Sequence, residues 1–148
     1  MKLAFGGDPN ASDLKEVLIA KAEELGHEVH DLGSDDPIYA NIASDVAKAV
    51  AAKEYDRGIL VCGTGIGVGI AANKVDGAYC AMIHDVYQAE RAVLSNNANL
   101  ISMGSQVIGT KLAEKLLEEY LKHEFDPNSR SKEKVDAICA FEAGDEKK

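Results

Sequence analysis

The chain has 148 residues, of which 46% are hydrophobic, and it carries a formal net charge of −9 at pH 7. This length and hydrophobic content predict one folded domain with a proper core and exclude a disordered chain. The negative charge argues against nucleic acid as a partner, because no basic stripe is left to neutralise phosphates. We expect no contact with a membrane, since no apolar run approaches the length that crosses a bilayer.

Apolar runs alternate with helical apolar stripes along the chain, and this alternation predicts a repeated strand–helix order. The strands are expected at Lys2–Gly6, His27–Leu32, Gly58–Val61, Ala78–Ile83 and Leu100–Met103. The helices are expected at Asp13–Leu25, Ile38–Lys53, Val68–Lys74, Val86–Leu94 and Ile108–His123. We therefore predict an α/β fold, a doubly wound five-stranded parallel sheet in the order 2-1-3-4-5 with helices on both faces.

The chain changes character after Pro127. The segment Asn128–Lys134 is polar, and the apolar residues that follow it predict a short helix, so the fold should end in a helical tail. We expect one domain over residues 1–143 and a disordered tail over residues 144–148.

Cysteine and histidine usage restricts the chemistry. The three cysteines, Cys62, Cys80 and Cys139, are widely spaced and form no Cys-x-x-Cys pair. An odd number of separate cysteines suits free thiols in a reducing cytoplasm, so we expect a cytoplasmic protein. The N-terminal apolar run is too short for a signal peptide. The four histidines show no metal-ligand spacing with cysteines or carboxylates, and we expect neither a metal nor another cofactor.

The most informative stretch follows the predicted strand Gly58–Val61. Cys62 stands there before four alternating glycines, which are Gly63, Gly65, Gly67 and Gly69. Glycines this dense leave backbone N–H groups free to converge on an anion, and the start of a helix adds the positive end of its dipole. The same field favours the thiolate form of the cysteine. The alternative is a tight strand-to-helix turn beside a small buried cysteine.

Two common phosphate-binding motifs are excluded for this stretch. No Gly-Lys-Ser/Thr closes the loop as in a P-loop, and the glycine spacing does not fit the dinucleotide fingerprint. The pattern therefore indicates a site for a small phosphorylated or carboxylated substrate beside a thiol. In the predicted strand order the crevice opens between the first and third strands, which brings Asp8 next to Cys62. His84 and the loop Ser95–Asn99 are expected along the same rim.

The glycine stretch also carries a family resemblance. Cys-Gly-Thr-Gly-Ile-Gly, followed by Ile-Ala-Ala-Asn-Lys-Val, resembles the signature of the type B ribose-5-phosphate isomerases and the related galactose-6-phosphate isomerase subunits. The likeness extends to Asp8, His84-Asp85, the stretch Asn96–Asn99 and the segment Gly104–Gly109. It implies a Rossmann-like fold and a metal-independent exchange between aldose and ketose phosphates. It also implies homodimers or homotetramers with sites at the subunit interface.

The resemblance assigns roles to single residues. Cys62 would be the base that moves a proton between two neighbouring carbons, through an enediolate held by amides of the Gly63–Gly69 loop. Thr64 matches the residue that handles the ring or the sugar oxygens, and Asp8 matches a hydroxyl-binding carboxylate. Asn96 is counted with the substrate-binding residues. For His84, a general acid and a rim residue paired with Asp85 are both open.

Departures from the family pattern concern basic side chains. Pro9 and Ser95 stand where the family usually has histidines, of which the second is credited with opening the sugar ring, and Gln106 replaces an arginine. Phosphate binding would then rest on Arg130 and Lys134. The alternative for these two residues is a solvated basic turn.

The lost histidines have a chemical interpretation. Ribose 5-phosphate is mostly a closed furanose, whereas a tetrose 4-phosphate has its terminal oxygen esterified and cannot close a five-membered ring. The pattern around Ser95 also resembles the branch of the family associated with tetrulose phosphates. We expect an isomerase of a tetrose or tetrulose phosphate or of ribose 5-phosphate. The alternative is a non-catalytic phosphosugar-binding subunit of a heteromeric isomerase, but such a subunit has no need of Cys62 and Thr64.

Overall fold

The computed structural model describes residues 1–33 and 35–143. Five strands form one parallel sheet: β1 (Lys2–Gly7), β2 (Glu28–Asp31), β3 (Arg57–Cys62), β4 (Cys80–Met82) and β5 (Leu100–Gly104). The helices are α1 (Ser12–Glu24), α2 (Tyr39–Ala51), α3 (Ile66–Ala72), α4 (Val86–Leu94), α5 (Thr110–Leu121) and α6 (Lys132–Ala140). Two 3₁₀ turns, η1 (Pro9–Ala11) and η2 (Phe141–Ala143), complete the chain.

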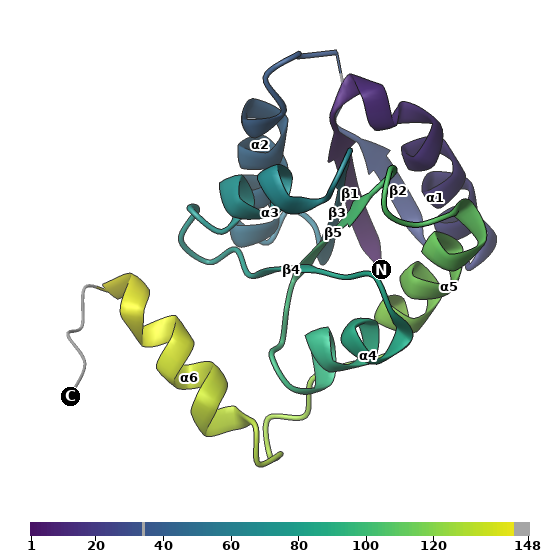
Figure 1. Ribbon diagram of the computed structural model, residues 1–148. Helices are drawn as coiled ribbons and strands as arrows, with labels where there is room; N and C mark the ends of the chain where they lie inside the picture. The colour runs from purple at the N-terminus through teal and green to yellow at the C-terminus, as the bar shows by residue number, and fades with distance from the viewer. Residues whose placement is uncertain (34, 144–148) are drawn as a thin grey trace.

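Helices cover both faces of the sheet, which confirms the predicted α/β fold (Figure 1). On one face, α2 and α3 pack over Ala4, Leu60 and Leu100. On the other face, α1, α4 and α5 pack over Phe5, Ile59 and other strand residues. The alternation of side chains along each strand divides the core in this way, because successive residues point to opposite faces.

The order of the last two strands differs from the prediction. The sheet runs 2-1-3-5-4, so β5 lies between β3 and β4. All five residues of β5 are buried, whereas the three residues of β4 are partly buried or exposed. A position between two strands and under helices on both faces suits β5, which is buried throughout and includes one polar residue, Ser102, while a short, half-exposed strand suits an edge. This contrast in burial agrees with the observed order.

Arg57 begins β3 and is buried despite its charge. Its guanidinium donates hydrogen bonds to the carbonyls of Tyr120 and His123, and its centre lies 4.7 Å from the centroid of the Tyr120 ring. Carbonyls at the end of a helix have no helical donor, so Arg57 satisfies groups that α5 cannot satisfy itself.

Replacing Arg57 with methionine should destabilise the fold. Methionine keeps much of the volume but leaves two buried carbonyls without a donor, and each such loss costs about 1–3 kcal/mol. We expect the free energy of unfolding in urea to fall by about 2–4 kcal/mol. Arg57→Lys, which keeps one donor group, should lose less. Equal stability of Arg57→Met and the unmodified protein would contradict this role.

The predicted C-terminal helix is confirmed as α6, which stands apart from the sheet (Figure 1). Val135 of this helix is buried, whereas Ile138 remains 43% exposed. The tail over residues 144–148, predicted to be disordered, lies outside the described residues. None of the described helices combines the length and the apolar character needed to cross a membrane.

Candidate functional site

The glycine loop, residues 63–69, joins the end of β3 to the first turn of α3. The N–H of Gly65 donates to Sγ of the buried Cys62 at 3.1 Å, and the N–H of Ile66 donates to Oγ1 of Thr64 at 3.2 Å. These are the first two of the four N–H groups that lack a helical acceptor at the start of a helix. Helical geometry leaves the N–H groups of Gly67 and Val68 without an acceptor in the preceding turn, and Gly67 is the partly exposed one of the two. The loop thus places one backbone donor against the sulfur and another against Thr64.

The backbone of β5 lies directly against this loop. The N–H groups of Ser105 and Gln106 donate to the carbonyls of Cys62 and Gly63, both at 2.9 Å. A Cβ atom on Gly104 would lie 2.5 Å from the carbonyl carbon of Thr64, which no real packing tolerates. The observed strand order, which differs from the predicted one, therefore affects the site directly: the end of β5, and not that of β4, packs against the loop.

Adding a methyl group at Gly104 should displace the loop. Gly104→Ala is expected to lower kcat at least about 10-fold and to destabilise the fold by about 1–3 kcal/mol, as overpacking commonly does. Gly109→Ala is the matched control, because a Cβ atom there meets no atom within 4 Å. Steady-state kinetics and urea unfolding of both variants test this expectation. It fails if the two alanine variants behave alike.

Two further side chains lie next to the glycine loop. Asp8 follows β1, its N–H donates to the carbonyl of Val61 at 2.9 Å, and its carboxylate accepts a bond from the N–H of Asn10 at 2.8 Å. Asp8 therefore stands beside the end of β3, where the crevice was predicted. Tyr39 begins α2, and its hydroxyl lies 2.3 Å from the position of a Cβ atom on Gly67. Any larger residue at position 67 would therefore have to displace the Tyr39 ring.

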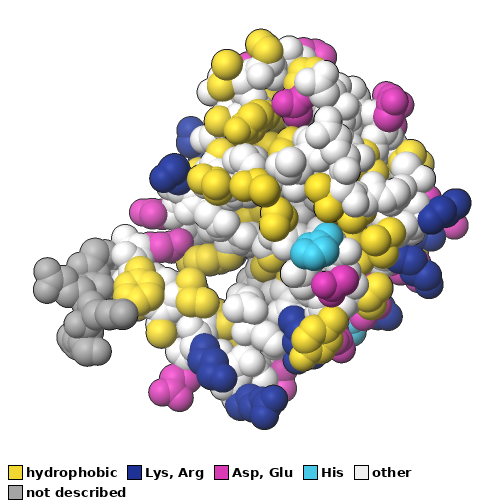
Figure 2. Space-filling model, viewed as in Figure 1, with side chains coloured by type: hydrophobic (Ala, Val, Ile, Leu, Met, Phe, Trp, Pro, Cys, Tyr) yellow, Lys and Arg dark blue, Asp and Glu magenta, His cyan; other side chains and the backbone are white. Residues whose placement is uncertain are grey.

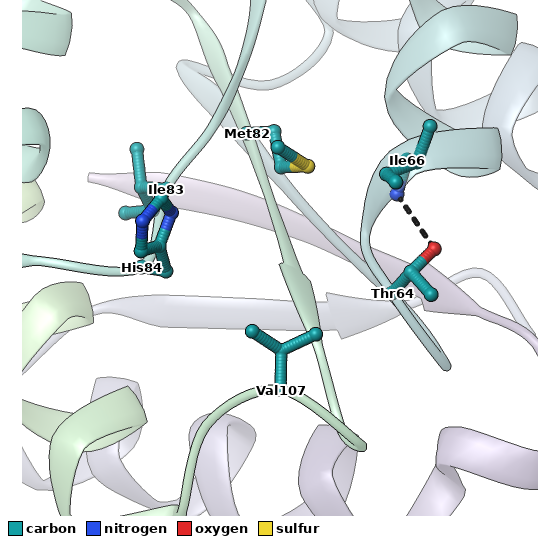
Figure 3. A pocket seen from close by; sticks show the side chains of 6 residues that line it. All are labelled: Thr64, Ile66, Met82, Ile83, His84 and Val107. Atoms are coloured by element: carbon teal, nitrogen blue, oxygen red, sulfur yellow. Dashed lines mark hydrogen bonds between the residues drawn. The ribbon is translucent and has the colours of Figure 1, made fainter.

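A pocket of about 250 Å³ opens beside the loop (Figure 3). Thr64 and Ile66 line one side, and the exposed ring of His84 lines the other. Three other lining residues were not predicted, because no motif marks them; these are Met82, Ile83 and Val107. The pocket thus has largely apolar walls and two polar side chains that differ in chemistry, a hydroxyl and an imidazole.

His84 and Asp85 have different surroundings. The carboxylate of Asp85 accepts a bond from the N–H of Gln88 at 2.8 Å and caps helix α4. The N–H of His84 donates to the side chain of Gln88 at 2.9 Å, which fixes the backbone at the pocket. The Asp85 carboxylate therefore caps helix α4 and does not pair with His84. The His84 ring faces the pocket.

The prediction that the loop Ser95–Asn99 shares the rim with His84 is wrong. This loop precedes β5, and the carbonyl of Asn99 accepts a bond from the N–H of Gly58 at the amino end of β3. In a parallel sheet every helix returns the chain to the amino ends of the strands, so a loop that follows a helix lies opposite the rim. Asn96 lines a separate hollow there, together with Ile138 of α6.

The predicted site residues therefore form two groups within one chain. Arg130 and Lys134 are exposed and belong to the segment around α6, which lies away from the glycine loop in Figure 1. Asn96 lies nearer to that segment than to the rim. At the carboxyl ends of the strands lie Asp8, Cys62, Thr64, His84 and the loop glycines, including Gly63, Gly65, Gly67 and Gly69.

In the described part of the chain, one cluster has the side chains to hold a metal ion. Glu90, Glu119 and His123 place one ligand atom each within 4.8 Å of one another, between α4 and α5. Cations already bind both carboxylates: Lys122 lies 2.6 Å from Glu119, and Arg91 lies 3.5 Å from Glu90. Hydrogen bonds from Lys122 and His123 lower the pKa of Glu119. The arrangement is that of an ion-pair network on the helix surface.

Comparison with known proteins identifies the family. A family model described as Ribose/Galactose Isomerase matches residues 3–138. The chain belongs to this family. It is 45% identical to D-erythrulose-4-phosphate isomerase 2 of Mycolicibacterium smegmatis, over 96% of this chain and 97% of the relative. It is 47% identical to ribose-5-P isomerase B of Listeria innocua, over 93% of this chain and 95% of that protein. The solved structure of type B ribose 5-phosphate isomerase from Trypanosoma cruzi superposes with a TM-score of 0.91 at 33% identity, covering 98% of this chain and 100% of that one.

Proposed function

We propose that this member of the sugar-phosphate isomerase family interconverts an aldose and a ketose 4-phosphate, with Cys62 as the base. The observation that carries the proposal is the hydrogen bond from the Gly65 N–H to the Cys62 sulfur, at the start of helix α3. A donor at this place stabilises negative charge on sulfur and holds the side chain in one orientation.

The chemistry follows from this geometry. The Cys62 thiolate takes the proton from the carbon next to the carbonyl, and the electron pair of that C–H bond forms a carbon–carbon double bond. The carbonyl oxygen receives the displaced pair and becomes an enediolate oxygen, to which the N–H of Gly67 can donate. The thiol then returns the proton to the neighbouring carbon. Thr64 and His84, on opposite sides of the pocket, would serve the hydroxyl protons that must move as well.

Pro9 and Ser95 support a four-carbon substrate. A tetrose 4-phosphate has no free hydroxyl at the position that closes a furanose ring, so it needs no ring-opening group. Neither proline nor serine supplies a base near neutral pH. One of the similar proteins is named for D-erythrulose 4-phosphate and another for ribose 5-phosphate, and these are the two candidate substrates.

The division of the predicted residues supports a homodimer or homotetramer. In one chain, Asn96, Arg130 and Lys134 lie away from Cys62. Two copies related by a two-fold axis can each give the glycine loop to one site and the basic residues to the other. We propose that each complete site forms in this way, with Arg130 and Lys134 binding the phosphate.

Isotope exchange tests the reaction itself. The purified enzyme is incubated with D-erythrulose 4-phosphate in deuterium oxide, and NMR follows deuterium at the carbon that loses its proton. We expect formation of the aldose phosphate together with deuterium incorporation, since an enediolate exchanges protons through the base. A protein that binds the sugar phosphate with neither turnover nor exchange would be the non-catalytic subunit instead.

Chelators should leave the activity unchanged. The residues that line the pocket include one histidine, His84, but no carboxylate and no cysteine, and backbone amides beside it can hold the enediolate. After dialysis against EDTA, kcat should stay within about 20% of its starting value, in keeping with a reaction that needs no Lewis acid. A loss of activity that a divalent metal restores would refute the metal-independent mechanism.

A further inference from the structure

Helix α6 is attached to the rest of the molecule at few points. Val135 is the buried residue of this helix, and Ile138 lines a hollow of about 240 Å³ beside β4, which separates the helix from the body in Figure 2. A further contact comes from Glu142 in the turn η2, directly after the helix. Because so little apolar surface holds α6 within one chain, its polar contacts contribute to its direction.

Glu142 binds two donors on the segment that leads into β4. Its Oε1 accepts a hydrogen bond from the N–H of Gly77 at 2.9 Å, and its Oε2 accepts one from the hydroxyl of Tyr79 at 2.7 Å. Gly77 has a φ of +87°, which side-chain-bearing residues rarely adopt. Burial, together with Cys139 and Glu142, raises the pKa of Tyr79, so its hydroxyl keeps the proton it donates.

Asn99 fixes the same segment from the other side. Its side-chain amide donates to the carbonyl of Gly77 and accepts from the N–H of Tyr79, both at 2.8 Å. Its own carbonyl accepts a bond from the N–H of Gly58 at 2.9 Å, at the start of the central strand β3. A continuous series of hydrogen bonds therefore connects the end of α6 to the middle of the sheet. The same series runs through the loop that carries Asn96.

We infer that Glu142 is a positioning residue for the isomerase reaction, which fixes the direction of α6 and thereby the places of Arg130 and Lys134. The inference rests on the proposed function, in which these two residues bind the substrate phosphate. Bonds to an ionised carboxylate are stronger than bonds to a neutral acceptor, and two of them on different donors fix an angle as well as a distance. Without Glu142, the contacts left to α6 within one chain are the buried Val135 and Cys139 beside Tyr79, which restrain its direction less.

Removing the carboxylate separates this role from catalysis. In Glu142→Ala, the KM for the sugar phosphate and the inhibition constant of inorganic phosphate should both rise at least about 10-fold, because misplaced charges bind phosphate poorly. The value of kcat should stay within about 3-fold, since Cys62 and its loop lie at the opposite end of the strands, where the strands finish. Glu124→Gln is the control: it removes one exposed carboxylate near α6 and should change neither constant.

A second variant keeps the test valid if alanine at 142 weakens folding. Tyr79→Phe removes one donor and keeps the ring, and its KM should rise about 3-fold. Adding it to Glu142→Ala should cause no further rise, because the two groups act through one bond. A large loss of kcat at unchanged KM in either variant would overturn the inference, as would independent, multiplying effects of the two substitutions.

The double variant of Arg130→Ala and Lys134→Ala shows which proposal fails, if one does. If it weakens inhibition by phosphate while Glu142→Ala does not, the inference on Glu142 is wrong and the phosphate site stands. If the double variant leaves phosphate inhibition unchanged, Arg130 and Lys134 do not bind the phosphate, and both proposals fall.

Discussion

Replacing Cys62 with serine is expected to lower kcat by at least about 100-fold, the low end of what a positioned general base contributes. A serine hydroxyl is far less acidic than a thiol and has no basic form near neutral pH. The substitution is nearly isosteric, and the serine oxygen can accept the same N–H of Gly65, so the fold and the loop should persist. Circular dichroism and urea unfolding would verify that. The KM should change little, because the substrate keeps its other contacts.

Cys80→Ser is the matched control for this variant. Cys80 is another thiol on the sheet, but burial raises its pKa to about 12, so it stays protonated at any pH at which the enzyme works. Its serine variant should keep nearly full activity. Cys62→Ser with near-normal turnover, or an equal loss in both variants, would remove Cys62 from the role of base.

The unmodified enzyme is expected to act on D-erythrose 4-phosphate or D-erythrulose 4-phosphate at least about 100-fold more efficiently than on D-ribose 5-phosphate. The pentose must first open its ring, which is a proton-transfer step, and Ser95 stands where the family usually has the histidine credited with this step. In the structure the Ser95 hydroxyl accepts a bond from Arg91 at 3.3 Å and has no base beside it among the described residues. The measured quantity is kcat/KM on each of the three sugar phosphates.

Ser95→His should restore part of the missing step. We expect kcat/KM on ribose 5-phosphate to rise more than that on the tetrose phosphates, because only the pentose needs an imidazole to open it. Ser95→Asn is a useful control, since it adds a polar side chain without a base. If the unmodified enzyme prefers ribose 5-phosphate, another group opens the ring, and the argument from Ser95 is wrong.

The features that the sequence predicted well are local ones. The run Gly58–Val61, Cys62 and the alternating glycines lie within a dozen residues, so their order along the chain already defines a strand, a loop and a helix start. The alternation of strands and helices likewise determines a parallel sheet, because each helix must return the chain to the same edge.

The features that the sequence did not predict depend on partners far along the chain. Nothing in the sequence around β4 or β5 states which of them pairs with β3, and the difference in burial between the two strands is seen only in the structure. The contribution of Val107 to the pocket follows from that pairing and was missed with it. The carbonyls that Arg57 binds lie more than 60 residues away, so no local pattern could have indicated its burial.

The separation of Cys62 from Ser95, Asn96 and α6 across the sheet bears on how this family diversifies. Residues that we propose to select the length of the sugar can mutate without disturbing the strand end that carries the proposed base. Within one chain the two groups share no loop, so a change in one leaves the local structure of the other intact, and in the proposed two-chain site they are coupled only through the substrate. New substrates can therefore arise by substitutions in the loop before β5 and around α6, while Cys62 and the glycine loop are inherited unchanged. Proteins named for erythrulose and ribose phosphates are both nearly half identical to this chain, as such divergence would produce.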